Sequence, residues 1–179
     1  MNGGMRMERL QRNRFLSDCR NSLLILLLGV VLGALGKWSD YHNMLLANLT
    51  SGVQLWILLG CAVAVFSRTC WRAGLHVCLL LGGMVGAYYC TAELMGVPWS
   101  KTFLIGWAAA AVFAALPGFF VWFTRGWSLQ AWLIRLGVLA VQALAVPVFS
   151  GRVNLPDVLL IAGTAAVLLW SGVEGGRRP

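Results

Sequence analysis

The stretch LLLGGMVGAYYCTAEL, residues 79–94, is the last part of an apolar run that begins near residue 73. A transmembrane helix needs about 20 mostly apolar residues, and this run has that length. Five further runs in the chain come close to it, at about 22–38, 52–67, 102–124, 129–149 and 157–173. The sequence therefore predicts an all-α polytopic membrane protein with six transmembrane helices in one bundle.

Composition agrees with a membrane location and excludes a soluble globule. Of the 179 residues, 59% are hydrophobic and 11% are charged, and the mean hydropathy is +0.77. So little polar surface cannot cover a water-soluble domain of this size. The net charge of +8 does not indicate a nucleic-acid partner, because the Lys and Arg residues are scattered between apolar runs and form no continuous face.

Basic residues are distributed unevenly between the short loops. The side of the predicted bundle that carries both termini collects most of the arginines, whereas the other side has Lys37, Lys101 and Arg152. Cytoplasmic loops carry the excess of Lys and Arg, so we expect both termini to be cytoplasmic. The predicted domains are a basic cytoplasmic leader (1–20), a six-helix transmembrane domain (21–173) and a short cytoplasmic tail (174–179). We expect the leader to lie on the anionic leaflet, with an ordered partner-binding helix as the alternative.

Small residues predict that the first and third helices touch. Glycines that share one helix face let a neighbouring backbone approach closely. The first helix has such a face, which Asp40 would extend, and the third has a GxxxG step from Gly82 to Gly86. The residues expected in helix packing are Gly29, Gly33, Gly36, Gly82, Gly83 and Gly86.

The third helix also has a polar arc that ends on Glu93. At 100° per residue, an arc of about 100° contains Arg72, His76, Gly83, Gly86, Cys90 and Glu93, and the opposite side, expected to face lipid, contains Val77, Leu81, Met84, Val85 and Tyr88. If helices one and three touch, Asp40 and Glu93 approach each other at the outer rim, with His42 and Lys101 nearby. Acids inside a helix bundle are functional candidates, so this arrangement predicts an outward-facing vestibule for a cation or a polar solute. The alternative is that Glu93 is an interfacial acid paired with Lys101, without a function.

Aromatic and basic residues elsewhere suggest weaker sites. Most of the nine tryptophans fall at the two membrane boundaries, as aromatic belts do. Only Trp56 and Trp107 lie deep enough to line an outer pocket. Arg135 is close enough to the cytoplasmic boundary to reach headgroups, and Arg72 and His76 lie one turn apart near the same boundary. We expect these three residues to contact lipid headgroups.

The chain shows no recognisable catalytic or metal-binding motif. HExxH, GxSxG and phosphate-loop patterns are absent from the sequence, and the five cysteines have no zinc-binding spacing. We therefore expect no catalytic residue, metal or cofactor. An enzyme that acts on lipid headgroups through Asp40, His42 and Glu93 is an alternative.

The run SGVQLWILLGCAVAVFSRTCWRAGLHVCLLLGGMVGAYY, residues 51–89, resembles a family of small uncharacterised bacterial membrane proteins. That resemblance covers the second and third helices and implies a bacterial inner-membrane location. In architecture the chain is similar to the substrate-binding S components of energy-coupling factor transporters, which dock through small residues in the cytoplasmic half of the first helix. Here Gly29, Gly33 and Gly36 lie in its middle and outer half, which departs from that pattern.

Two functions follow from these observations. The first is binding or transport of a small polar solute at a site between the first three helices, with Asp40 and Glu93 as acceptors and Trp56 as an apolar wall. The second is a non-catalytic accessory or scaffolding subunit, whose glycine faces pack against another membrane protein or a second copy of the chain.

Overall fold

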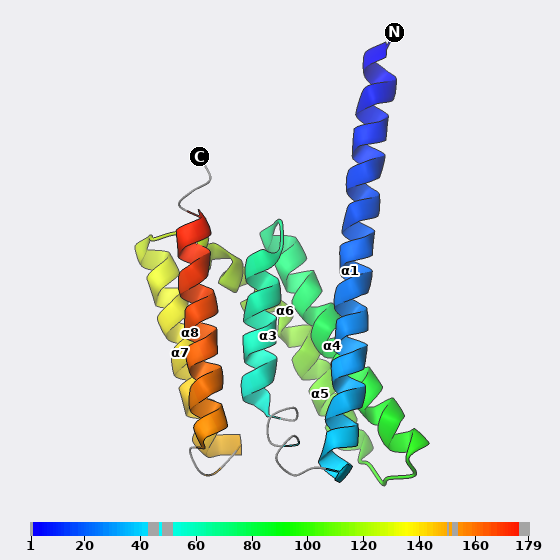
Figure 1. The fold of residues 1–179 in the computed structure, drawn as a ribbon, viewed down its shortest axis with the longest axis vertical. Coiled ribbons are helices and arrows are strands. Elements are labelled where there is room, and N and C mark those ends of the chain that lie inside the picture. The colour runs from blue at the N-terminus through cyan, green and yellow to red at the C-terminus, as the bar shows by residue number, and fades with distance from the viewer. Residues whose placement is uncertain (1, 43–46, 48–51, 150, 152–153, 176–179) are drawn as a thin grey trace.

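The computed structural model of the chain describes residues 2–42, 47, 52–149, 151 and 154–175. These residues form helices joined by turns and loops, with no strand among them, as the predicted all-α class requires. Figure 1 shows the helices side by side, with α1 extending beyond the others. In chain order they are α1 (Asn2–His42), α3 (Val53–Phe66), α4 (Cys70–Leu94), α5 (Lys101–Phe113), α6 (Ala115–Val121), the 3-10 helix η1 (Trp122–Arg125), α7 (Leu129–Phe149) and α8 (Leu155–Gly175).

Five of the described helical segments are long and apolar enough to cross a membrane. The predicted multi-pass membrane protein is confirmed at this level. The remaining apolar helix, α3, has 14 residues and measures about 21 Å, less than the roughly 30 Å of a bilayer core. It packs against α4, α6, α7 and α8. Neighbouring protein therefore surrounds much of this short helix.

The basic N-terminal segment continues α1 without a break. α1 has 41 residues and measures about 60 Å, twice the thickness of a bilayer core. Figure 1 shows its N-terminal part projecting past the end of the bundle at which α8 also ends. We call this end the terminal end. The opposite end, where a cavity lies between α1, α3, α4 and α5, is called the pocket end. The predicted boundary at residue 20 is thus not a boundary in secondary structure.

Prolines mark where two helices break or begin. Pro117 has no N–H to donate to the carbonyl of Phe113, and α5 ends at Phe113 while α6 begins two residues later. Pro156 lies in the first turn of α8, where its missing N–H costs no hydrogen bond. The N–H of Asn154 donates to Asp157 Oδ2 at 3.1 Å, which fixes the start of that helix.

α4 lies at the centre of the fold and packs against α1, α3, α5 and α6. This corrects the predicted orientation of its two faces, because four residues expected to face lipid are buried: Val77, Leu81, Met84 and Val85. The exposed stripe of α4 contains Leu75, Gly82, Gly86, Cys90 and Glu93. Lipid tails and protein neighbours are equally apolar, so polarity alone does not tell which face of a membrane helix is covered by protein.

Glycines decide how closely α1 and α4 approach. A Cβ at Gly29 or Gly33 would overlap the backbone carbonyls of Leu80 and Met84, and a Cβ at Gly83 would lie 2.9 Å from the carbonyl oxygen of Leu26. These three glycines lie in the helix–helix contact that the sequence suggested. A Cβ at Gly82 or Gly86 would meet no described atom within 4 Å, which corrects the expectation that this GxxxG step packs inside the chain.

Candidate functional site: an aromatic pocket

A cavity of about 130 Å³ lies between α1, α3, α4 and α5, towards the pocket end. Its small and aliphatic lining comes from Leu32, Gly33, Gly36, Met84 and Val85. Gly33 and Gly36 lie on the face of α1 that is turned towards α4. Gly33 lets the backbones of α1 and α4 meet closely, and the cavity lies beside this contact, where Gly36 adds no side chain to fill it.

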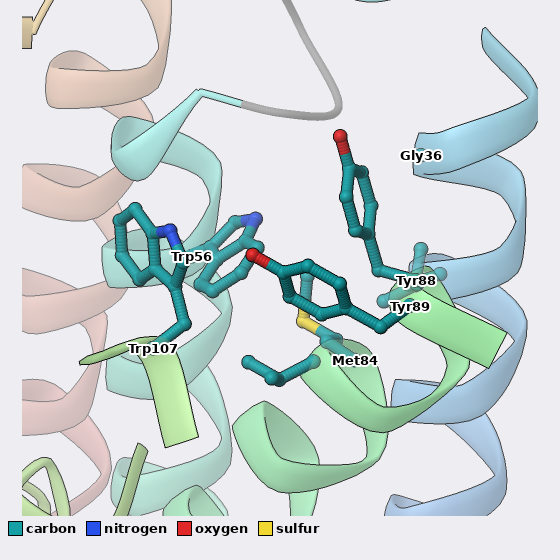
Figure 2. Close-up of a pocket in the computed structure, with 9 residues that line it drawn as sticks. Gly36, Trp56, Met84, Tyr88, Tyr89 and Trp107 are labelled. Atoms are coloured by element: carbon teal, nitrogen blue, oxygen red, sulfur yellow. The ribbon is translucent and has the colours of Figure 1, made fainter. Parts of the chain in front are cut away.

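The rest of the lining is aromatic: Trp56 on α3, Trp107 on α5, and Tyr88 and Tyr89 on α4. The ring centroids of Trp56 and Trp107 are 5.3 Å apart, with the rings inclined by 55°. Those of Tyr88 and Tyr89 are 5.4 Å apart and inclined by 72°. Figure 2 shows the two indoles on one side and the two phenols on the other, with the Tyr89 hydroxyl pointing towards Trp56.

The end of α4 is fixed by a glycine turn next to the pocket. Gly96 has φ of 65°, in the left-handed region that glycine adopts without strain. The N–H of Val97 donates to the carbonyl of Ala92 at 3.0 Å, which is the pattern of a Schellman motif. This turn brings the following residues back along α4, so that Trp99 Nε1 donates to Glu93 Oε2 at 2.6 Å.

Asp40 and Glu93 are each held by an aromatic donor at the rim of the pocket. The Tyr88 hydroxyl donates to Asp40 Oδ2 at 2.6 Å, and Glu93 accepts from Trp99, whose ring meets Tyr89 edge-on at 5.6 Å. Both acids are exposed and neither belongs to the cavity lining. Asp40 is thus bound to a ring that lines the pocket, whereas Glu93 is bound to Trp99, which contacts the lining ring of Tyr89.

The residues predicted to form a polar vestibule are exposed and are not among those that line the cavity: Asp40, His42, Glu93 and Lys101. His42 stacks on Trp38 with centroids 4.7 Å apart, and its Nδ1 donates to the Trp38 carbonyl at 2.9 Å. Lys101 is exposed at the start of α5. Within the described part of the chain, no three His, Cys, Asp or Glu residues form a group that could hold a metal ion. A vestibule formed by these four residues therefore stays a prediction, separate from the aromatic cavity.

The terminal end contains a different polar arrangement, in which side chains from three helices are bonded to one another. Asp18 of α1 pairs with Arg72 of α4 at 2.5 Å and with Arg68 at 3.4 Å. Ser67, which follows α3, donates its hydroxyl to the Val63 carbonyl at 2.7 Å. These residues belong to what we call the terminal-end network: Asp18, Ser22, Ser67, Arg72, His76 and Arg125.

His76 is the centre of that network. Because the only hydroxyl hydrogen of Ser67 goes to a carbonyl, its Oγ accepts from His76 Nδ1 at 2.8 Å. His76 Nε2 then accepts from the Ser22 hydroxyl at 3.2 Å. His76 is buried, which corrects its predicted contact with lipid headgroups. Arg72, predicted to make the same contact, is bound to Asp18.

Arg125 caps the end of α3. Its Nε donates to the Val65 carbonyl at 2.7 Å, and its Nη2 donates to the carbonyls of Val65 and Ser67. The last carbonyls of a helix have no partner within the helix. The guanidinium of Arg125, in η1, thus supplies hydrogen-bond donors to the carbonyls at the end of α3, a helix that is distant from it in sequence.

Arg135 was also expected at the lipid headgroups, but its side chain is only 2% exposed. Its Nη2 donates to the carbonyls of Thr124 and Gly126 at 2.7 and 2.9 Å. Its guanidinium lies 5.0 Å from the ring of Trp127 and 5.2 Å from that of Trp132. Carbonyls and indoles, and not phosphate groups, are therefore the partners of this arginine, because the turn between η1 and α7 folds over it.

Of the pocket residues, sequence reasoning singled out Trp56, Trp107, Gly33 and Gly36 and missed the tyrosines. Tyr88 was placed on the lipid-facing side, with Met84 and Val85. The adjacent pair at 88–89 lies at the same depth along its helix as the two tryptophans lie along theirs, and this common depth was the available signal. Comparison with protein-family models, with curated proteins and with solved structures gave no match, so the pocket is interpreted from its own residues.

Proposed function

We propose that this membrane protein binds a small solute in the aromatic pocket, as the binding step of a transport function. The supporting observation is the cavity lined by rings from α3, α4 and α5. Ligand pockets are concave and largely apolar, with a few polar groups that fix orientation, and they occur between the helices of bundles. This cavity fits that description, with the Tyr88 and Tyr89 hydroxyls as its polar groups.

We further propose that the pocket end faces outward. The terminal end carries Arg20, Arg68, Arg72 and Arg125, and an excess of arginine is characteristic of the cytoplasmic side. With the resemblance to bacterial membrane proteins, this orientation would place the chain in a bacterial inner membrane with both termini in the cytoplasm. No catalytic role is part of the proposal.

A solute screen tests the function. The full chain would be purified in detergent, and its unfolding temperature measured with vitamins, amino acids, nucleobases, organic cations and soluble headgroup analogues. A ligand at 100 times its Kd stabilises the folded state by about 2.7 kcal/mol. We expect at least one solute to raise the midpoint in the wild type and not in Trp107→Ala. Trp170→Ala is the matched control, because Trp170 is 63% exposed and does not line the pocket.

A scaffolding role is the second candidate, and the exposed glycines of α4 favour it. Gly82 and Gly86 are open to a second membrane helix, and small residues promote such contacts. If no solute shifts the midpoint, the solute-binding proposal fails. Loss of a co-purifying membrane partner in Gly86→Leu, with the fold intact, would then support the scaffold.

A further inference from the structure

We infer that the pocket selects a small organic cation of the methylated-ammonium class. This inference rests on the solute-binding function proposed above and names its substrate class. Two observations carry it: the arrangement of the rings and the position of the two acids behind them. A lysine that lies over one ring supplies a test of the ligand's charge.

The rings offer faces to a cation. Cations are attracted to the face of an aromatic ring, and more strongly where water is excluded. The rings within each pair are inclined by 55° and 72°, so neither pair is stacked face to face. The two pairs come from opposite sides of the cavity (Figure 2). A cation in the cavity would therefore meet aromatic rings on two sides.

The acids make the pocket more negative without entering it. A phenol that donates to a carboxylate has a more electron-rich ring, and Tyr88 donates to Asp40 at 2.6 Å. Glu93 adds a second carboxylate behind Trp99, which contacts Tyr89. Since no carboxylate is among the described residues that line the cavity, a primary ammonium would lose its hydrogen bonds to water with few acceptors in return. A methylated ammonium has no such requirement, because its charge is spread over apolar methyl groups.

Lys37 lies close enough to the pocket to test the charge of the ligand. Its Nζ lies 5.0 Å from the centroid of the Tyr88 ring, on the helix that also carries Asp40. This ring thus already attracts one cation of the chain itself, although Lys37 does not line the cavity. A cationic ligand would be repelled by Lys37, whereas an anionic ligand would be attracted by it. Removing the lysine therefore tests the charge of the ligand directly.

The cavity size limits the ligand. A cavity of about 150 Å³ in another protein accommodates benzene, and this one is about 130 Å³. A trimethylammonium group is of comparable size and fits such a space. This group could come from a free solute or from a lipid headgroup, and the two sources share the same chemistry.

Choline and its uncharged carbon isostere, 3,3-dimethylbutan-1-ol, give the decisive comparison. Binding of each to the full chain in phosphatidylglycerol nanodiscs would be measured by isothermal titration calorimetry. We expect choline to bind at least about tenfold more tightly than the isostere. We expect Lys37→Met to tighten choline binding about threefold and to leave the isostere unchanged. Trp56→Leu should weaken choline about tenfold, with Trp170→Leu as the unaffected control.

The outcomes separate this inference from the proposed function. Equal binding of both compounds would overturn cation selectivity while the pocket remains a solute site. Weaker choline binding in Lys37→Met would also overturn it, and this variant changes no lining residue. Binding of neither compound would overturn the inference, and the broader solute screen then decides the function. If choline is selected, loss of its binding in phosphatidylcholine nanodiscs identifies a lipid headgroup as the source, and unchanged binding supports a free solute.

Discussion

At the terminal end, His76 of α4 bonds to Ser22 of α1 and to Ser67, which follows α3, and Arg125 caps the end of α3. At the pocket end, Asp40 accepts a hydrogen bond from Tyr88, and Glu93 accepts one from Trp99. The first arrangement fills the space between helices with polar partners. The second fixes aromatic rings around a space that stays open. The comparison teaches that polar residues at a membrane boundary can either join helices or support a cavity, depending on which groups bind them.

The largest expected effect concerns the contact that both ends share, between α1 and α4. Gly33→Leu would drive a side chain into the backbone of Met84, and no rotamer change can relieve an overlap with backbone. We expect a loss of at least about 3 kcal/mol in the free energy of unfolding, measured by denaturant unfolding in detergent. Gly82→Leu is the control, because a Cβ there meets nothing, and it should change stability by less than about 0.5 kcal/mol. Equal losses in both variants would contradict the described contact.

The next effect is specific to the terminal end. Arg125→Met leaves the Val65 carbonyl without its side-chain donor and the Ser67 carbonyl with Trp122 Nε1 alone, and an unpaired buried carbonyl costs about 1–3 kcal/mol. The matched variant Arg68→Met removes an arginine of the same end whose side chain is 57% exposed, which should cost less than about 1 kcal/mol. The measurement is again the free energy of unfolding. A similar cost for both arginines would show that the cap of α3 does not contribute to stability.

A smaller effect is expected at the turn that supports the pocket. Gly96→Ala places a Cβ at a φ of 65°, and left-handed backbone costs a non-glycine residue about 1–2 kcal/mol. Gly106→Ala, in α5 with nothing within 4 Å of its Cβ, should be neutral or slightly stabilising because alanine favours helix. Thermal unfolding of the two variants gives the comparison. If Gly96→Ala is as stable as Gly106→Ala, the turn does not hold the end of α4.

The smallest stability effect, and the most direct test of the difference between the two ends, comes from two aspartates. Asp40→Asn keeps an acceptor for Tyr88 but removes the charge, so we expect a stability loss below about 1 kcal/mol. Choline affinity should fall about threefold. Asp18→Asn makes the same chemical change at the terminal end and should leave choline affinity unchanged. Calorimetric titration of both variants decides whether only the pocket-end acid acts on the rings.

Much of this protein follows from its sequence. The apolar runs located the helical segments of the described chain, five of which are long enough to cross a membrane, because the length of an apolar run and the placement of Pro and Gly are local properties. The contact of α1 with α4 could be proposed from Gly29 and Gly33 for the same reason. Trp56 and Trp107 were placed near a pocket by depth alone, since 1.5 Å per residue along a helix needs no tertiary information.

Only the tertiary structure decided which faces are covered and what the polar groups bind. Met84, Val85 and Tyr88 were assigned to lipid, yet α1 and α3 cover that side of α4. His76 and Arg135 were assigned to headgroups, yet a serine pair and two carbonyls bind them. The physical reason is that lipid and protein interiors are both apolar, so hydrophobicity locates a helix in the membrane. The neighbours of each face depend on close packing between segments that are distant in sequence.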